Sequence, residues 1–449
     1  MIRTPVFSGS TSALLTAILC LVLVPPAPPV LHAAAGDLDP TFGKGGKVTT
    51  GFPGDSNDAA FGVAVQPDGR IVAAGISVGT SVQFGLARYN RDGSLDTTFG
   101  DGGTVRTGFR DWEMAVGVDI QRDGKIVAAG TSLSPDGLSP SGFAVARYNC
   151  DGSLDATFGD GGKIVTEFPN DTFTEARAMT IQPDGRILVV GTAWGPTGMT
   201  TDLAIARYTK DGSLDPSLGG GGTVIANVDQ EDDARAVAVS FDGRITVAGS
   251  TRGLLQMNSD IAVVRLRRDG SLDTTFGAGG IVRTNAMGQQ EFANSVQIQR
   301  DGRIVVAGST IGTTPWFTED VVLARYNPDG SLDQTFGKGG IVVADLEGAM
   351  DEVSAAALQI DGKILVGTTN FTVSRFDANG SLDPTFGAGG IAHADFSTPD
   401  AHLAAGLTAL AIQRDGRIVA AGGVSDFTTF TGSFALARFD ASSASPAPR

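Results

Sequence analysis

Histidine, cysteine and basic residues are scarce in this 449-residue chain. Three His and two Cys are too few for a multi-histidine metal centre or a disulfide-rich scaffold. The 33 Lys and Arg face 49 Asp and Glu, and the resulting net charge of −16 would repel a nucleic-acid backbone. Glycine is abundant, with 62 residues, and 41% of all residues are hydrophobic, so a packed fold is expected rather than disorder.

The N-terminal segment has the pattern of an export signal. Arg3 is its only charge, and an apolar run over residues 13–24 precedes Ala33-Ala34-Ala35. The run is too short to span a bilayer comfortably, and no other segment approaches that length. We therefore expect residues 1–35 to be removed near Ala35 and the mature chain to be secreted, periplasmic or on the cell surface. Lipidation at Cys20 is the alternative, which Leu19 disfavours because a small residue normally precedes such a cysteine.

Three short sequence blocks each occur seven times in the remainder, always in the same order. A Leu-Asp-x-x-Phe/Leu-Gly block begins at Leu38, Leu95, Leu154, Leu214, Leu272, Leu332 and Leu382. An Asp-Gly-Arg/Lys-Ile block begins at Asp68, Asp123, Asp184, Asp242, Asp301, Asp361 and Asp415. A third block contains an Arg followed by Tyr, Leu or Phe, at Arg88, Arg147, Arg207, Arg265, Arg325, Arg375 and Arg438. One structural unit is therefore repeated seven times.

Each repeat has the pattern of four β-strands. In the first, residues 61–66, 70–75 and 84–90 are apolar segments separated by turns, and a fourth segment runs from Leu95 through a Gly-rich step to 104–107. Four strands in about 58 residues, without sustained helical periodicity, favour an all-β fold. We expect a seven-bladed β-propeller of four-stranded antiparallel blades over residues 36–440, followed by a flexible tail over 441–449.

The two ends of the chain carry complementary parts of the repeat. Residues 38–43 form a fourth-strand block without three strands before it, and residues 434–439 form a third-strand block without a fourth strand after it. Pairing of these segments would complete the last blade and leave no unpaired edge between first and last blades. The alternative is a set of blades that match whole repeats, with no shared strand.

Turn chemistry predicts a set of ion pairs. In Asn327-Pro328-Asp329-Gly330, Pro at the second position and Gly at the fourth suit a type I turn with a left-handed Gly. Counting outward from this turn places Arg325 opposite Asp333, eight residues later. The predicted pairs are Arg88–Asp96, Arg147–Asp155, Arg207–Asp215, Arg265–Asp273, Arg325–Asp333, Arg375–Asp383 and, through closure, Arg438–Asp39.

With these recurrent DGSLDxTFGxGG and QxDGRIVxAG blocks, the sequence resembles the delta-60 repeat family of bacterial exported proteins. The resemblance covers about residues 37–440 and implies a β-propeller fold and export. It transfers no function, since the family has no assigned activity or binding residues. Leu218, Leu266 and a shortened loop at 368–370 depart from the pattern.

Motifs for catalysis or cofactor binding are missing. Aligning Gly93 with the invariant Gly of an EF-hand places Arg88 and Phe99 at ligand positions, so that motif fails. Beyond residue 35 only His393 and His402 are available as bases, and Cys150 is expected to be an exposed, incidental turn thiol. We expect no cofactor; calcium is compatible with the acidic loops but has no motif.

Function is expected where the repeats differ, in the loops between second and third strands and between fourth strands and the next repeat. In an antiparallel blade both sets open on one face. The candidate binding residues there are Trp112, Trp194, Trp316, Asp229, Glu231, Asp232 and Asp233. Further acids of these loops are Asp55, Asp58, Asp111, Glu113, Asp171, Glu175, Glu291, Glu347, Asp351 and Glu352.

These residues favour a non-enzymatic binding or scaffold module, expected to be monomeric, whose partner is an unknown protein or glycan. The alternative is a carbohydrate-active hydrolase or lyase, which would need two loop carboxylates about 5–10 Å apart beside a Trp. A purely structural envelope or surface protein would have no pocket. An acidic rim that only confers solubility is the simplest interpretation of the acids.

Overall fold

The computed structural model describes residues 34–441, apart from 55–56, 111, 134–140, 169–172, 196–197, 199, 230, 254–257, 288–289, 313–317, 347–350, 398–402, 427–428 and 430. These residues form 28 β-strands joined by turns and bends, and no helix. Consequently none of them belongs to a helix long and apolar enough to cross a membrane. The predicted signal peptide lies outside the described residues, except for Ala34 and Ala35.

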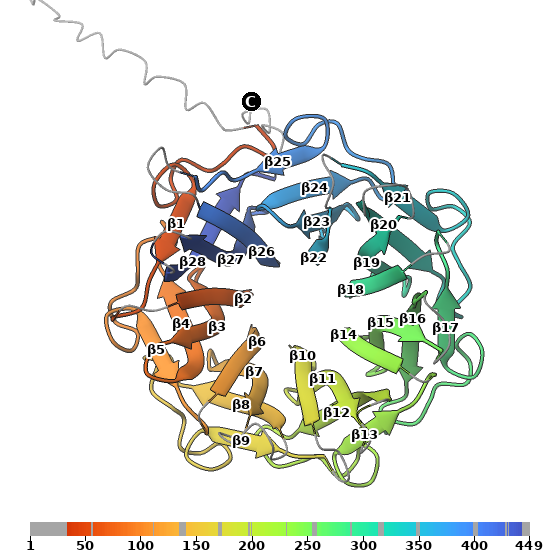
Figure 1. Ribbon diagram of the computed structural model, residues 1–449, viewed down its shortest axis with the longest axis horizontal. Coiled ribbons are helices and arrows are strands. Elements are labelled where there is room, and N and C mark those ends of the chain that lie inside the picture. The colour runs from red at the N-terminus through yellow and green to blue at the C-terminus, as the bar shows by residue number, and fades with distance from the viewer. Residues whose placement is uncertain are drawn as a thin grey trace, which may run out of the picture. The chain divides into compact units, whose positions relative to one another are not determined.

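Four strands recur in the same order along the chain (Figure 1). The first strands are β2 (Asn57–Val65), β6 (Trp112–Ile120), β10 (Phe173–Ile181), β14 (Glu231–Val239), β18 (Gln290–Ile298), β22 (Val353–Leu358) and β26 (Leu403–Ile412). The second strands are β3 (Ile71–Val78), β7 (Ile126–Leu133), β11 (Ile187–Trp194), β15 (Ile245–Arg252), β19 (Ile304–Ile311), β23 (Ile364–Thr368) and β27 (Ile418–Asp426).

The third strands are β4 (Val82–Tyr89), β8 (Gly142–Tyr148), β12 (Thr201–Tyr208), β16 (Asp260–Leu266), β20 (Glu319–Tyr326), β24 (Thr372–Phe376) and β28 (Thr431–Phe439). The short fourth strands are β5 (Thr104–Thr107), β9 (Lys163–Thr166), β13 (Thr223–Ala226), β17 (Ile281–Thr284), β21 (Ile341–Ala344), β25 (Ile391–His393) and β1 (Lys47–Thr50). Each four-stranded unit is named below after its first strand.

Within a unit the strands pair antiparallel in chain order, and the first strand lies innermost in Figure 1. The strand β1 is the exception in sequence, because it pairs antiparallel with β28 from the far end of the chain, with Lys47 opposite Ala437. We call the end of the sheets with the first-to-second and third-to-fourth connections the turn side, and the opposite end the loop side.

The fourth strand is more interrupted than the sequence indicated. Leu95 makes one bridge to Tyr89, and the chain then turns through Gly100, Gly102 and Gly103 before β5 resumes pairing with β4. These glycines have φ values of 55°, 61° and 108°, which L side chains rarely adopt. The prediction of one strand from Leu95 onward was therefore wrong: the Leu-Asp block is a bridge and a turn.

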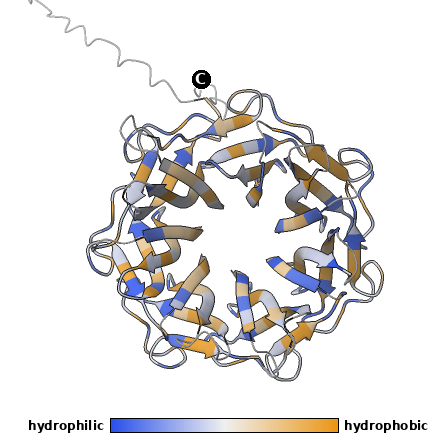
Figure 2. Ribbon diagram, in the orientation of Figure 1, coloured by the Kyte–Doolittle hydropathy of each residue, from blue (hydrophilic) through white to orange (hydrophobic). Residues whose placement is uncertain are grey.

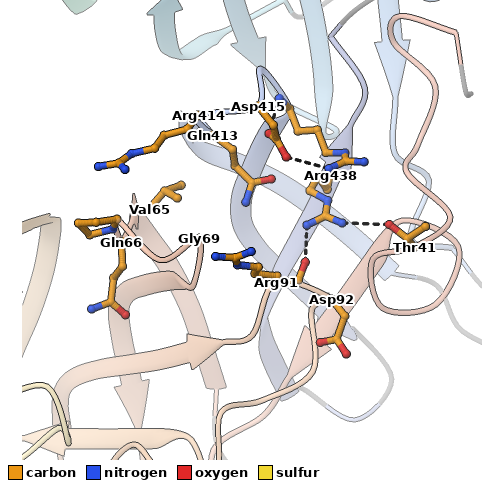
Figure 3. A pocket seen from close by; sticks show the side chains of 12 residues that line it. Thr41, Val65, Gln66, Gly69, Arg91, Asp92, Gln413, Arg414, Asp415 and Arg438 are labelled. Atoms are coloured by element: carbon orange, nitrogen blue, oxygen red, sulfur yellow. Dashed lines mark hydrogen bonds and ion pairs between the residues drawn. The ribbon is translucent and has the colours of Figure 1, made fainter. Parts of the chain in front are cut away.

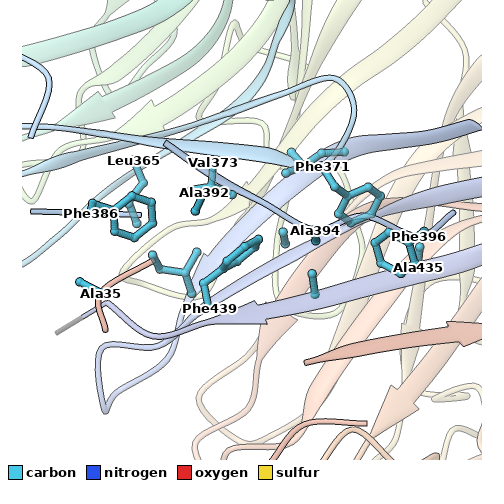
Figure 4. Packing of buried hydrophobic residues seen from close by; sticks show 14 of the residues in the cluster. Ala35, Leu365, Phe371, Val373, Phe386, Ala392, Ala394, Phe396, Ala435 and Phe439 are labelled. Atoms are coloured by element: carbon cyan, nitrogen blue, oxygen red, sulfur yellow. The ribbon is translucent and has the colours of Figure 1, made fainter. Parts of the chain in front are cut away.

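Hydrophobic clusters pack successive units together. The first strand of a unit alternates buried and half-buried residues, as in β2, whereas the second and third strands are buried along most of their length. Hydrophobic residues occur on strands around the fold (Figure 2), and the buried side chains of one unit meet those of the next. One cluster joins the β22 and β26 units through residues such as Leu365, Phe386 and Phe439 (Figure 4). Another joins Phe434 of β28 with Ile71 of β3, so the last and first units share a core.

The packed chain begins slightly before the predicted domain boundary at residue 36. Ala35 is 2% exposed, lies in the cluster of Figure 4, and accepts a hydrogen bond from the Gly387 amide. Gly36 donates to the Asp440 carbonyl at 2.6 Å. At the other end, the Ala441 carbonyl accepts a hydrogen bond from Arg375. Residues 442–449 of the predicted tail lie outside the described residues.

Candidate functional site

Every predicted arginine meets its predicted aspartate. The turn after β20 is as expected: the Asn327 amide donates to the Ser331 carbonyl, and the Asp333 amide donates to the Arg325 carbonyl. Across all the pairs the distance from arginine Nε to aspartate Oδ2 is 2.7–2.8 Å. Arg438 and Asp39, 399 residues apart, make the same contact. All of these arginines and aspartates are buried.

A second cation supports each aspartate, which sequence reasoning missed. The Arg or Lys of the Asp-Gly-Arg/Lys block approaches the same carboxylate, at distances between 2.6 Å (Lys125–Asp155) and 3.3 Å (Arg70–Asp96). Burial alone raises the pKa of Asp155, but hydrogen bonds from Lys125 and Thr157 and the charge of Arg147 lower it more. The pKa of this carboxyl therefore lies well below its usual range. The sevenfold recurrence of the block was the available signal.

The same arginines connect each unit to the next. Arg88 donates through Nη1 to the Cys150 carbonyl of the β6 unit, and Arg438 of the β26 unit donates to the Arg91 carbonyl of the β2 unit. Most of these guanidinium groups also lie over a phenylalanine ring, as Arg147 does over Phe158 at 4.5 Å. Arg207 has no such ring, because Leu218 occupies the position of the phenylalanine.

Tyrosine–threonine contacts form a further link between units. The buried Tyr148 hydroxyl donates to Thr107 of the preceding unit at 2.8 Å. Tyr208 pairs with Thr166 and Tyr326 with Thr284 in the same way. Thr50 of β1 lies beside the Tyr89 hydroxyl, although without a hydrogen bond of ordinary geometry. Where Leu266, Phe376 and Phe439 replace the tyrosine, Ala226, Ala344 and Ala394 replace the threonine.

Many loop-side acids are buried structural groups rather than members of a solvated rim. Asp58 accepts a hydrogen bond from the Phe52 amide, Glu291 from the Ala286 and Met287 amides, and Asp351 from the Leu346 amide. All three carboxyl groups are buried. Each holds the connection from a fourth strand to the next unit, since buried amide groups need acceptors. Asp55, Asp111, Asp171 and Glu347 lie outside the described residues.

The candidate acids at 229–233 have the same kind of role. Asp232 is fully buried and accepts hydrogen bonds from the Val228 amide and the Thr251 hydroxyl. Burial raises its pKa more than these bonds lower it. The other three acids are each paired with an arginine: Asp229 with Arg283, Glu231 with Arg252 and Asp233 with Arg235. The segment therefore carries much less free negative charge than its sequence suggests.

The candidate tryptophans do not gather around these acids. Trp112 begins β6 and is 37% exposed, whereas Trp194 ends β11 and packs edge-on against Phe173 at 4.8 Å. Both therefore lie in strands, not in loops as predicted. Trp194 faces Thr201 of β12, which in turn faces Glu231 of β14. Trp316 lies outside the described residues.

A small loop-side pocket of about 190 Å³ lies at the start of β14 and β18. Glu231, Asp233, Arg235, Arg252 and the aromatic side chain of Phe292 line it, with both charge signs present. No described tryptophan lines it. Such a pocket can hold a polar group between carboxylate and guanidinium partners.

One pair of neighbouring carboxylates has pKa values shifted in opposite directions. Burial raises the pKa of Glu175, helped by the negative charge of Asp233. Burial also acts on Asp233, but the charges of Arg235 and Arg177 and a bond from Thr192 bring its pKa below the ordinary value. Arg177 lies between the two acids, 3.0 Å from Glu175 and 3.8 Å from Asp233.

The remaining candidates have ordinary surroundings. His393 lies in β25 with its Nδ1 at 2.8 Å from the Thr372 hydroxyl, and His402 lies outside the described residues. Cys150 is an exposed free thiol in a turn, as expected. Among the described residues, no group of three or more His, Cys, Asp or Glu side chains is arranged to hold a metal ion.

A protein-family model matches parts of the chain. The model described as "Domain of unknown function (DUF5122) beta-propeller" matches residues 66–99, 121–158, 182–218, 242–276, 299–336 and 359–386. No curated protein matches the chain. With the repeated antiparallel sheets, this match gives the chain a β-propeller fold of unknown function.

Three solved structures that resemble the chain share little sequence with it. A protein of unknown function from Dyadobacter fermentans is 14% identical, with 88% of this chain and 98% of that chain covered and a TM-score of 0.48. The WD40 β-propeller domain of Doa1 is 11% identical, with 86% and 98% covered and a TM-score of 0.42. BamB from Moraxella catarrhalis is 10% identical, with 84% and 83% covered and a TM-score of 0.39.

Proposed function

We propose that this β-propeller chain is a closed ring of seven four-stranded blades, exported in the manner of delta-60 repeat proteins. Three contacts between the chain's ends support closure. The strand β1 pairs with β28, Arg438 bonds Asp39 at 2.8 Å, and Thr408 of β26 donates to the Ala60 carbonyl of β2 at 2.8 Å. A ring closed in this way has no free sheet edge at its joint.

The function that this geometry supports best is that of a non-enzymatic binding scaffold for a protein or glycan. The observation that carries it is the contrast between the two kinds of polar residue. Side chains that recur in every unit are used up in contacts that hold the ring, such as Arg147 with Asp155. The pocket with Glu231, Asp233 and Arg235 is instead built from residues that differ between units.

The loop side is thus the proposed ligand surface. The pocket offers acidic and basic groups within one hollow, and Trp112 is exposed at the loop-side end of its sheet. Rigid sheets that present variable loop ends are a common basis for binding sites. Polar hydroxyl-rich ligands and protein loops both suit such a surface.

A glycoside-cleaving enzyme is the second candidate, because Glu175 and Asp233 have oppositely shifted pKa values, as acid–base pairs do. Its weakness is the position of Arg177. The guanidinium group occupies the space between the carboxylates, where a sugar ring would have to lie. The binding scaffold is therefore preferred.

Glycan and extracellular-protein arrays probed with the exported protein test the proposal. We expect a ligand whose binding falls at least about tenfold in Trp194→Ala or Trp112→Ala, a loss typical of an interface anchor. The matched control is Phe241→Ala on the turn side, which should bind normally. Unchanged binding after replacement of Trp112, Trp194 and Trp316 together would refute the loop side as the ligand surface. Release of reducing sugar by the wild-type protein would favour the enzyme instead.

A further inference from the structure

The first-to-second turns on the turn side carry one residue that varies from unit to unit. It precedes the Asp of the Asp-Gly-Arg/Lys block and lies at the tip of the turn. The tip residues are Pro67, Arg122, Pro183, Phe241, Arg300, Ile360 and Arg414. Acidic residues do not occur at this position, although the chain as a whole has a net charge of −16.

Two of the tips are unusually exposed apolar side chains. Phe241 is 95% exposed and Ile360 is 84% exposed, more than any other large hydrophobic side chain among the described residues. A lone exposed apolar residue is normal on a protein surface. Here the two most exposed ones occupy the same structural position on one side of the fold, which is the distribution expected of a contact surface.

Three other tips are arginines without partners. Among the described residues, Arg122, Arg300 and Arg414 make no hydrogen bond or ion pair. The arginines two positions after the turn Asp behave differently: Arg303 pairs with Asp301, and Arg417 with Asp415. The tip guanidinium groups are therefore free to bind an anion.

Pockets between neighbouring turns combine these two chemistries. Arg122 and Phe241 line a pocket of about 520 Å³, and Arg300, Arg414 and Ile360 line another of about 780 Å³. A third, of about 490 Å³, contains Arg414 (Figure 3). In each of the two larger pockets, at least one unpaired guanidinium group lies beside an exposed apolar side chain.

In the described part of the chain, the glutamine before the tip has a buried side-chain oxygen without a partner in six units, at Gln66, Gln121, Gln182, Gln299, Gln359 and Gln413. Gln413 lines the two pockets that share Arg414 and is only 7% exposed (Figure 3). Its Oε1 atom has no hydrogen-bond partner among the described residues. A buried acceptor left unpaired is costly, and an N–H group of a bound chain would satisfy it.

We propose that the turn side is a second binding surface, for an acidic segment of another protein in which carboxylates alternate with apolar side chains. Its carboxylates bind the guanidinium groups of Arg122, Arg300 and Arg414. Its apolar side chains cover Phe241 and Ile360. Asp301 and Asp361 also line the larger pocket, but the unpaired groups at the tips are guanidinium groups. They select this occupant, because arginine binds carboxylates bidentately and is enriched, with aromatic residues, at interface hot spots.

A second copy of the chain fits less well. If two copies met through this same side, the carboxylates facing the tip arginines would mostly be turn aspartates that already bind an arginine of their own block, such as Asp301 with Arg303 and Asp415 with Arg417. Anionic glycans would satisfy the arginines but leave Phe241 and Ile360 in water.

Selection from a displayed library of random 12-residue peptides on the full exported protein tests the proposal. We expect the selected peptides to be enriched in Asp and Glu together with Phe, Leu and Ile. The best synthetic peptide should bind at least about tenfold more weakly to R122A/R300A/R414A and to F241S/I360S, by fluorescence anisotropy. Its affinity should also fall as salt increases. The matched control W194A, on the loop side, should bind with wild-type affinity, so this surface can fail independently of the proposed loop-side site.

Four results would overturn the proposal of an acidic segment on the turn side or one half of it. A selected pool without acidic enrichment, or no selected peptide at all, would overturn the proposal. So would a peptide whose affinity is the same for wild type and for R122A/R300A/R414A. Binding of polyglutamate that equals the peptide's affinity and ignores F241S/I360S would show plain anion binding and reject the apolar half. Self-association that F241S abolishes, by sedimentation, would replace the acidic segment with a second copy.

Discussion

Substitution of one of the seven buried arginines that pair with aspartates should destabilise the whole fold. Arg147 is 5% exposed, bonds Asp155 at 2.8 Å and the Thr157 hydroxyl at 3.2 Å, and also donates to the Lys210 carbonyl of the next unit. In Arg147→Met, loss of one partner from a buried pair costs about 3–5 kcal/mol. Lys125 remains 2.6 Å from Asp155 and covers part of that loss, so we expect about 3 kcal/mol.

Two matched variants make this measurement specific. Arg207→Met breaks the same kind of pair but has no ring over its guanidinium, because Leu218 replaces the phenylalanine, so its cost should be smaller by about 0.5–1 kcal/mol. Arg122→Met removes an unpaired, solvent-facing arginine and should change stability by less than about 0.5 kcal/mol. Equilibrium urea denaturation gives all three values. A loss below about 1 kcal/mol for Arg147→Met, or one equal to that of Arg122→Met, would refute the claim that the buried Arg–Asp pairs stabilise the fold.

Two further predictions concern buried polar groups. Tyr148→Phe should lower the free energy of unfolding by about 1 kcal/mol, because it leaves the Thr107 hydroxyl without its partner. Adding Thr107→Ala should recover part of that loss, since the chain itself combines Leu266 with Ala226 at these positions. Losses that simply add in urea denaturation would contradict this. Carboxyls with lowered pKa values, such as Asp155 and Asp383, contribute stability that is complete above their unfolded pKa of about 3.9 and is lost as the pH falls through the folded pKa. Acids whose pKa values are raised by desolvation, such as the half-buried Asp119 and the buried Asp232, favour folding as they take up protons. The melting temperature should therefore hold or rise between pH 7 and about 4 and fall only below that; a steady decline from pH 7 would contradict the shifts.

The sequence predicted those features that depend on local turn geometry. The Pro-Asp-Gly turn determines its own register, so Arg325 could be placed opposite Asp333 without any tertiary information. The loop-side ends of β6 and β11 could not be placed in the same way, because they depend on pairing with neighbouring strands. Trp112 and Trp194 were for that reason expected in loops.

Charge roles on the loop side were harder to predict. Asp232 is buried, whereas Glu231 is bound by Arg252 of β15 and Asp233 by Arg235 of its own strand. Sequence alone does not show which of these acids is buried and which is paired. The Tyr–Thr contacts could have been predicted from the sequence. Wherever a tyrosine follows the buried arginine of a unit, a threonine ends the preceding fourth strand, as with Tyr148 and Thr107. Comparing repeats position by position would have found them.

Closure of the chain on itself is tested most directly by an engineered disulfide. Thr49 of β1 faces Ala435 of β28, so Thr49→Cys with Ala435→Cys in a Cys150→Ser background places two thiols on directly paired residues. We predict that the exported variant forms this bond, seen as a faster band on a non-reducing gel and the loss of two hydrogens by mass spectrometry. Thr49→Cys with Ala324→Cys, from β20, should stay reduced. Free thiols in the Thr49–Ala435 variant under oxidising conditions would contradict the pairing of the chain's two ends.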